Sequence, residues 1–337
     1  MKRRPVALVI LFLFLRCTLA QNKPLMPGPD RIRLAEAFRL GESIDDRLWK
    51  GWGKAPFAVL LVTPEYEYLI RHPKPSEDFT PLGYDSLLKG DVYVRQRTQR
   101  TDLLATFPAI KESAIPTIVV GQAENTAAKT STPWVVTLLH EHFHQLQYSQ
   151  PSYYQDVNGL NLSRGDQTGM WMLNYAFPYD RKEVQEQFSA VARLLVEALG
   201  AGKADRPMRL AAYLQARRRF QQLLGPDDYR YFSFQLWQEG VARYTEYHAA
   251  EFAATRFTPS REFRALKDFT PFGQVASSIH ENIVRQLLTQ QLGESKRAMF
   301  YPFGAAEGLL LDSVNRSWRS RYFVDKFDLS KHYRVTN

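Results

Sequence analysis

Hydrophobic and polar positions follow two different rhythms along the chain. Between Phe57 and Val120, short apolar runs are separated by Gly and Pro, and FAVLLVTPEYEYLI predicts two strands joined at a TPE turn. GDVYVRQR and PTIVVG predict further short strands. After Thr132, apolar residues recur every three or four positions, which is typical of amphipathic helices. The sequence therefore predicts an α+β chain, in which a mixed β-sheet comes first and helices follow.

The helical pattern is clearest in four long segments, most of which end at or beside a glycine. They are RKEVQEQFSAVARLLVEALGAG, MRLAAYLQARRRFQQLLG, FQLWQEGVARYTEYHAAEFAATRF and FGQVASSIHENIVRQLLTQQLG. We therefore expect an N-terminal α/β region over residues 21–130 and a mainly helical region over residues 131–337. Neither region contains an internal repeat.

Residues 1–20 do not belong to this pattern. MKRRPVALVILFLFLRCTLA combines a basic start, an apolar run and small residues at Thr18 and Ala20, as a secretory signal peptide cleaved before Gln21 does. The apolar run from Val6 to Leu15 is too short to span a bilayer. We therefore expect a secreted or periplasmic protein that has no membrane segment once the signal is removed.

Cleavage would change both the charge and the cysteine content. It removes four basic and no acidic residues, so the formal charge falls from +9 to +5 and support for a nucleic-acid partner weakens. It also removes Cys17, the one cysteine of the sequence, which excludes disulfides and thiolate metal sites from the mature chain. Any metal site must then be built from histidines and carboxylates. The oligomeric state stays open.

One helical stretch, WVVTLLHEHFHQLQYSQP, contains three of the seven histidines. Thr132 as N-cap, followed by proline, predicts a helix over residues 133–148. His140 and His144 are four residues apart and share one face, and Glu141 leans toward the same side. In this H-E-x-x-H pattern two imidazoles bind a metal, and the glutamate acts on the water that the metal acidifies. Neutral imidazole suits Zn²⁺, which is the expected cofactor.

A second interpretation stays open, in which these histidines are hydrogen-bonded core residues. It is the preferred interpretation for His142, which lies about 200° around the helix from His140 and points to the opposite side. We expect His142 to pack in the core or to support the site indirectly.

A catalytic zinc takes three protein ligands and a water, so a third ligand is needed. The stretch LWQEGVARYTEY is its best source, because Glu239 is followed by small residues that allow two helices to approach closely. A carboxylate buried beside Trp237 would be costly unless a cation accompanied it. Glu246, by contrast, is expected to be an exposed helix residue. His248 and His280 are the alternative third ligands.

H-E-x-x-H on one helix and E-G-x-A-x-Y on a later one resemble the gluzincin zinc metallopeptidases, the thermolysin-like and aminopeptidase-like group. The matching positions are His140, Glu141, His144, Glu239, Gly240, Ala242 and Tyr244. The resemblance implies a zincin-like catalytic region in which His140, His144 and Glu239 bind zinc and Glu141 is the general base. Ninety-four residues separate His144 from Glu239, more than in the familiar members, which implies a helical insertion over about 152–230.

Two further features take their meaning from this resemblance. Gluzincins bind an extended substrate along an edge strand before the active-site helix, and residues 117–120 are expected to form that strand. They also use a Tyr or His on a later helix to stabilise the developing oxyanion. Tyr301 follows Glu239 by 62 residues, about where the relatives place this residue, and is the candidate.

The sequence thus predicts a secreted zinc metallopeptidase that hydrolyses a peptide or protein substrate and binds no nucleic acid. Two alternatives stay open: a zinc-dependent hydrolase of a non-peptide bond, and a non-catalytic zinc- or partner-binding protein. Glu141 argues against the non-catalytic alternative, because a structural zinc site needs no base beside its ligands and tends to be closed by four of them.

Overall fold

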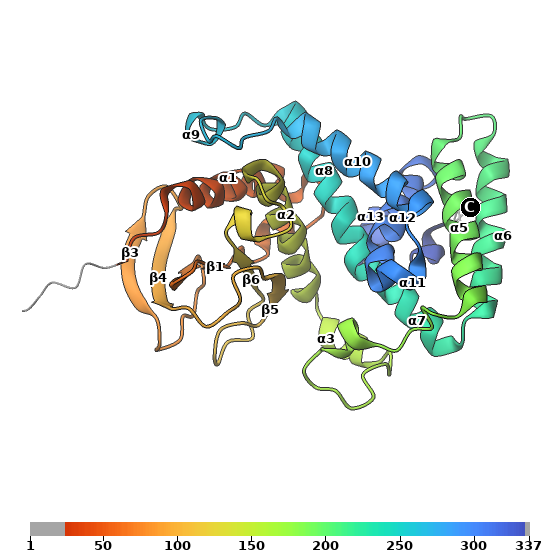
Figure 1. The fold of residues 1–337 in the computed structure, drawn as a ribbon, viewed down its shortest axis with the longest axis horizontal. Helices are drawn as coiled ribbons and strands as arrows, with labels where there is room; N and C mark the ends of the chain where they lie inside the picture. The colour runs from red at the N-terminus through yellow and green to blue at the C-terminus, as the bar shows by residue number, and fades with distance from the viewer. Residues whose placement is uncertain (1–23, 334–337) are drawn as a thin grey trace, which may run out of the picture.

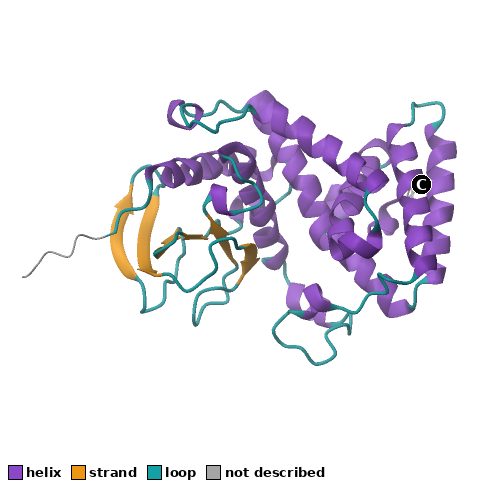
Figure 2. Ribbon diagram, viewed as in Figure 1, coloured by secondary structure: helices purple, strands orange, loops and turns teal. Residues whose placement is uncertain are grey.

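A computed structural model describes residues 24–333 and shows a mixed α+β architecture, as expected. The expected signal peptide lies outside the described residues. A six-stranded sheet occupies one side of the molecule and the later helices the other, with helix α2 (Ser131–Tyr148) between them (Figure 1). Figure 2 shows the same separation by type of secondary structure.

The strands of the sheet pair in the order β3-β4-β2-β1-β6-β5. They are β1 (Val59–Val62), β2 (Tyr66–Ile70), β3 (Thr80–Asp85), β4 (Gly90–Gln96), β5 (Leu104–Phe107) and β6 (Thr117–Gly121). β1 and β6 run parallel, and all other neighbours run antiparallel. The strands predicted at β1, β2, β4 and β6 are confirmed. β3 and β5 are additional strands that the sequence pattern does not indicate.

The expectation that residues 117–120 form an edge strand is wrong. β6 lies between β1 and β5, and it is buried at every position. Its uninterrupted apolar run, TIVV, fits this location, because a strand covered on both faces shows no alternation of polar and apolar residues. The edge of the sheet on this side is β5.

Successive side chains of the central strand β1 enter two different apolar clusters, as side chains on opposite faces of a sheet do. Val59 and Leu61 join the main core, to which helix α1 (Gly28–Ile44) contributes Phe38. Leu60 and Val62 join a smaller cluster on the other face. The main core continues from the sheet through α2 into the helices beyond, so α2 is buried along most of its length.

The chain beyond α2 is almost entirely helical. Its helices are α3 (Tyr153–Asn158), α4 (Trp171–Asn174), α5 (Lys182–Gly200), α6 (Arg206–Leu223), α7 (Pro226–Gln235), α8 (Val241–Arg256), α9 (Arg261–Arg264), α10 (Phe272–Thr289), α11 (Leu292–Ser295), α12 (Phe300–Val314) and α13 (Trp318–Arg321). The four predicted helices correspond to α5, α6, α7 with α8, and α10. None of the helices within residues 24–333 combines the length and apolar character that crossing a membrane requires.

Helix α2 begins at Ser131, two residues before the predicted start, and Thr132 is not its N-cap. The first turn is satisfied by a distant residue instead. Asp268 accepts hydrogen bonds from the backbone N–H of Ser131 at 2.9 Å and from its hydroxyl at 2.6 Å. A carboxylate at this end also complements the helix dipole. The hydroxyl of Thr132 accepts from the backbone N–H of Thr270. The sequence cannot show a cap that arrives from more than a hundred residues away.

Candidate metal centre

His140 and His144 on α2 lie close to Glu239, which belongs to the turn just before α8. One ligand-type atom from each residue lies within 4.8 Å of the other two. Nε2 of His144 lies 3.2 Å from Nε2 of His140 and 3.3 Å from Oε2 of Glu239. Nε2 of His140 lies 3.9 Å from the same carboxylate oxygen. This group can hold a metal ion, and it unites the three residues that the sequence selects as ligands.

Gln147 fixes the protonation pattern of His144. Its amide nitrogen donates to the carbonyl oxygens of Trp237 and Gln238, at 3.3 and 3.0 Å, and to the hydroxyl of Tyr322 at 2.8 Å. The amide oxygen is therefore the atom that faces Nδ1 of His144, at 2.6 Å. The amide nitrogen of Gln238 also approaches Nδ1, at 3.3 Å, but the oxygen of Gln147 is much closer. Because that oxygen can only accept, Nδ1 carries the proton and Nε2 is the nitrogen that faces the cluster.

Glu246 stands behind His140, where the sequence had placed an exposed residue. Only 5% of Glu246 is exposed, so that expectation is wrong. It follows Glu239 by about two helical turns and therefore faces α2 as well. Oε2 of Glu246 lies 3.4 Å from Nδ1 of His140, an ion-pair distance, and Arg243 donates to the carboxylate at 2.7 Å. A carboxylate behind the ligand favours the tautomer in which Nε2 is the free nitrogen.

The electrostatics of the cluster favour a cation. The Nε2 atoms of His140 and His144 face each other at 3.2 Å, a hydrogen-bond distance at which one of them carries the proton. Burial alone would lower the pKa of His144, but the charge of Glu239 and its hydrogen bond, together with Glu141 and Gln147, outweigh burial and raise the pKa to about 9. Burial alone would raise the pKa of Glu239, but His144, together with Arg297 and His140, lowers it. Without a metal, His144 therefore carries a proton that a bound cation would replace, and two imidazole nitrogens with an ionised carboxylate are then the donor set of a metal ion.

Glu239 lies in a π-helical turn, Leu236–Gly240, that joins α7 to α8. π-helical turns are rare and frequently occur at functional sites. This turn is tied to α2, because the carbonyls of Trp237 and Gln238 accept the hydrogen bonds from Gln147 described above. The side chain that orients one ligand, His144, therefore also anchors the backbone that carries Glu239.

Glycines bring α12 against this turn. A Cβ built on Gly240 would lie 2.4 Å from the Cα of Gly304, and one built on Gly304 would lie 2.6 Å from the carbonyl oxygen of Leu236. Neither position has room for a methyl group. Because Tyr301 precedes Gly304 by about one helical turn, the same close crossing carries Tyr301 to the cluster.

Tyr301, the residue that the sequence suggests as oxyanion donor, lies beside His140. Its ring is 6.3 Å from that of His140 and nearly parallel to it. Its hydroxyl oxygen accepts a hydrogen bond from Nη1 of Arg297 at 2.9 Å. Since Arg297 supplies the proton of that bond, Tyr301 can donate its own hydroxyl proton, and the carboxylate of Glu239 is its acceptor here. Burial raises the pKa of Tyr301 well above its usual value, so the hydroxyl remains a neutral donor.

Glu141 is buried next to the cluster and is held by a residue of the edge strand. Thr106 on β5 donates from its hydroxyl to Oε2 of Glu141 at 2.7 Å. The negative charge of Glu141 also contributes to the raised pKa of His144, which indicates that its carboxylate is close to the cluster. Sequence reasoning does not identify Thr106 or Arg297. The one available signal is the helical spacing of four residues between Arg297 and Tyr301.

The remaining candidate histidines lie elsewhere. His142 packs in the core, as expected: its ring stacks on Phe57 with centroids 3.9 Å apart, and burial lowers its pKa to about 4. His248 pairs with Asp312, at 3.1 Å, and with Glu251, at 2.8 Å, instead of joining the cluster. His280 lies beside Tyr247, with ring centroids 5.6 Å apart.

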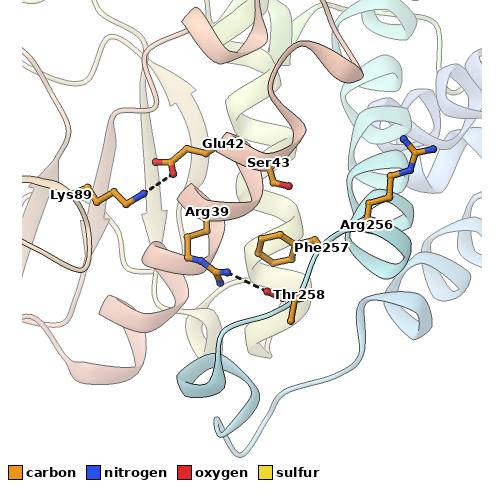
Figure 3. Close-up of a pocket in the computed structure, with 7 residues that line it drawn as sticks. All are labelled: Arg39, Glu42, Ser43, Lys89, Arg256, Phe257 and Thr258. Carbon is orange, nitrogen blue, oxygen red and sulfur yellow. Dashed lines mark hydrogen bonds and ion pairs between the residues drawn. The ribbon is translucent and has the colours of Figure 1, made fainter.

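Two surface hollows lie outside this centre. One, of about 320 Å³, is formed by α1 and the chain at the end of α8, where Lys89 pairs with Glu42 and Arg39 donates to the carbonyl of Thr258 (Figure 3). The other, of about 400 Å³, lies between α8 and α10. His280, one of the alternative third ligands, lines the second hollow, whereas His140, Glu141, His144, Glu239 and Tyr301 line neither.

Comparison of the chain with known proteins found no relative. No family model, no curated protein and no solved structure matches the chain. The functional interpretation therefore depends on the arrangement of the side chains themselves.

Proposed function

We propose that this protein is a secreted or periplasmic zinc metallopeptidase with a zincin-like catalytic region. The observation that carries the proposal is the meeting of His140, His144 and Glu239 beside a buried carboxylate, Glu141, that is not part of the ligand group. A structural metal site has no need of this carboxylate, whereas hydrolysis requires a general base.

The donor set supports zinc as the metal. Two imidazoles and one carboxylate are a frequent ligand set of catalytic zinc, and three protein ligands leave one position open. His144 is hydrogen-bonded from behind by Gln147, as zinc-binding imidazoles generally are, and the carboxylate of Glu246 lies 3.4 Å behind His140. When bound, zinc supplies a Lewis acid for the scissile carbonyl and lowers the pKa of water.

The side chains of the cluster divide the remaining work. Glu141 accepts the proton of the attacking water and delivers it to the leaving amine, and Thr106 holds Glu141 in place for both transfers. Tyr301, whose hydroxyl donates to Glu239 before substrate binds, would turn that proton to the carbonyl oxygen as negative charge develops there. Arg297 holds the Tyr301 oxygen from the opposite side and so directs that proton.

The edge strand β5 is a suitable surface for a peptide. It is the last strand of the sheet on this side, and the side chain of Thr106 reaches the proposed base, so β5 runs beside the cluster. An extended peptide can pair with the free edge of a strand through backbone hydrogen bonds. This edge favours a peptide substrate over a non-peptide one, which the same catalytic groups could hydrolyse.

Metal analysis combined with a peptide-library digest tests the proposal. We expect about one zinc per purified chain. The variants His140→Ala and His144→Ala are expected to lose zinc and activity, whereas His280→Ala keeps both. Glu141→Gln is expected to keep zinc and to lower turnover by about 10²–10⁴, the contribution of general-base catalysis.

The outcomes separate the alternatives. A folded protein that binds no added zinc contradicts the metal centre. A zinc-containing protein that cleaves no peptide but hydrolyses esters or other amides supports the non-peptide alternative. Undiminished hydrolysis by Glu141→Gln contradicts the role of Glu141. Tyr301→Phe is expected to keep zinc and to lower kcat by about 10²–10³ with little change in KM, as loss of an oxyanion donor does.

A further inference from the structure

Arg297 places a fixed positive charge beside the candidate metal centre. Its Nη1 lies 2.9 Å from the Tyr301 hydroxyl and 3.3 Å from Oε1 of Glu239, whose other oxygen faces the histidine pair. It also lies 3.5 Å from the amide oxygen of Gln235. The guanidinium stacks over the ring of Tyr301, with Cζ 5.3 Å from the ring centroid. Together these contacts fix the plane of the guanidinium.

All of these hydrogen bonds use one nitrogen of Arg297. Within the part of the chain that the structure describes, Nε and Nη2 have no hydrogen-bond partner, and 25% of the side chain is exposed. The Nε–Nη2 edge of a guanidinium can bind a carboxylate through two parallel hydrogen bonds. Arg297 therefore presents an unused carboxylate-binding edge in a fixed orientation.

Arg297 is the most exposed of the four side chains His140, His144, Glu239 and Arg297. The exposed fraction of the side chain rises from 6% in His144 and 8% in His140 to 16% in Glu239 and 25% in Arg297. A substrate that enters from solvent therefore meets Arg297 before it reaches the histidines.

The local charges leave room for an additional anion. A divalent cation on the ligand group and the guanidinium of Arg297 carry three positive charges, against the two negative charges of Glu239 and Glu141. A neutral substrate would leave this excess uncompensated, whereas a substrate with one carboxylate would balance it.

We propose that Arg297 binds the C-terminal carboxylate of the substrate, so that the protein is a carboxypeptidase. The inference rests on the proposed function. Water adds to the carbonyl carbon of the last peptide bond, and the C–N bond breaks. The proton taken up by Glu141 passes to the departing amine. The products are one free amino acid and a peptide shortened by one residue.

The terminal residue of this substrate would extend from the ligand group to Arg297. The last peptide carbonyl and the terminal carboxylate belong to successive residues, which are at most about 3.6 Å apart along an extended chain. Nε2 of His144 and Nη1 of Arg297 each lie 3.3 Å from one of the two oxygens of Glu239. The Nε–Nη2 edge is on the far side of the guanidinium from Nη1, so an extended terminal residue would have to reach across the guanidinium to this edge. A chain that continued beyond the cleaved bond would instead place an uncharged amide against the guanidinium.

Equilibrium binding tests the proposal without turnover. Zinc-loaded Glu141→Gln protein is titrated in a calorimeter with an N-acetylated tetrapeptide that the wild type cleaves, once as the free acid and once as the C-terminal amide. We expect the acid to bind about 10- to 100-fold more tightly, the range that hydrogen bonds between charged groups supply. In Glu141→Gln/Arg297→Gln this ratio is expected to fall to about twofold or less, because the side chain is no longer charged.

Matched variants separate recognition from general charge and from folding. Lys296→Gln removes a neighbouring exposed charge and is expected to keep the preference for the acid. Arg297→Lys keeps the charge but loses the two-nitrogen edge, so it is expected to retain only part of the preference. Zinc content and melting temperature are measured for each variant. Because the acid and the amide are compared within one protein, any effect of Arg297 on Tyr301 or Glu239 cancels in the ratio.

The outcomes distinguish this inference from the proposed function. Preference for the acid that disappears in the Arg297→Gln background supports carboxylate binding. Equal binding of acid and amide, or release of internal fragments by the wild type, overturns it and leaves the metallopeptidase proposal standing. A zinc-loaded wild-type protein that cleaves no peptide contradicts the proposed function, and this inference with it.

Discussion

Gly240 and Gly304 touch backbone to backbone: a Cβ added to Gly240 would lie 2.4 Å from the Cα of Gly304. The contact joins the turn that carries Glu239 to the helix that carries Tyr301. Two groups that are far apart in sequence are thereby held at one centre. The distance between Glu239 and Tyr301 therefore depends on Gly240 and Gly304 having no side chains.

Replacement of Gly304 by alanine should therefore damage fold and site together. The added methyl would meet backbone atoms, which cannot move aside as a flexible side chain does. We expect Gly304→Ala to lower the free energy of unfolding by about 1–3 kcal/mol, as overpacking does. Zinc affinity should fall as well. Gly200→Ala is the control, because no atom lies within 4 Å of its added methyl. Urea unfolding and zinc titration measure both effects, and unchanged values for Gly304→Ala would contradict the crossing.

Gln147 should affect the metal centre through His144. Gln147→Leu removes the oxygen that fixes the tautomer of this histidine, and we expect zinc affinity to fall about 10- to 100-fold, as loss of such supporting contacts does. Gln145→Leu is a matched control. Gln145 occupies the same helix and contacts His142 in the same way, at 2.9 Å, but His142 is not at the centre. It should lose stability and keep zinc affinity. Equal zinc affinities in the two variants would contradict the role of Gln147.

Thr106 should affect turnover without affecting zinc. Thr106→Val removes the hydroxyl that donates to Glu141 and leaves a side chain of similar shape. We expect kcat to fall about tenfold, in line with the loss of a hydrogen bond to a charged group, while zinc content stays unchanged. Thr106→Ser retains the hydroxyl and should recover most of the activity. If the serine variant is as slow as the valine variant, packing of β5 and not the hydrogen bond is responsible.

The ligand group is predictable from the sequence because its information is local. His140, Glu141 and His144 follow the period of a helix, so their common face is visible in one short stretch. Glu239 is farther away, and the small residues after it are the signal: Gly240 makes the close contact with α12. The strands β1 and β2 and the long helices follow from periodicity in the same way.

The supporting groups could not be predicted, because each acts across elements. Thr106 contacts Glu141 because β5 is the edge strand of the sheet. The order of strands in a sheet cannot be inferred from the sequence of a single strand. Arg297 joins the centre through the packing of α12 on the π-helical turn. Glu246 carries the same residue type as exposed glutamates, and its burial depends on which face of α8 meets α2. These are properties of packing, which a linear pattern does not contain.

His248 lies away from the metal centre, in a group of charges between α8 and α12. Its Nε2 is 3.1 Å from Asp312 and its Nδ1 is 2.8 Å from Glu251. Arg319 also approaches Asp312, at 3.8 Å. Burial alone would lower the pKa of His248, but the hydrogen bonds to Asp312 and Glu251 outweigh burial and raise it above 6.5. The protonated imidazole is therefore bound more favourably in the folded than in the unfolded chain.

This linkage gives stability a defined dependence on pH. A raised pKa in the folded state contributes stability that is fully present below the unfolded pKa of about 6.5 and is lost as the pH rises through the folded value. We expect wild type to exceed His248→Gln in unfolding free energy most strongly near pH 5.5, and the difference to shrink steadily toward pH 9. Glu251→Gln removes one partner and should flatten the dependence. Urea unfolding across this range measures it. A difference that grows with pH would contradict a protonated His248.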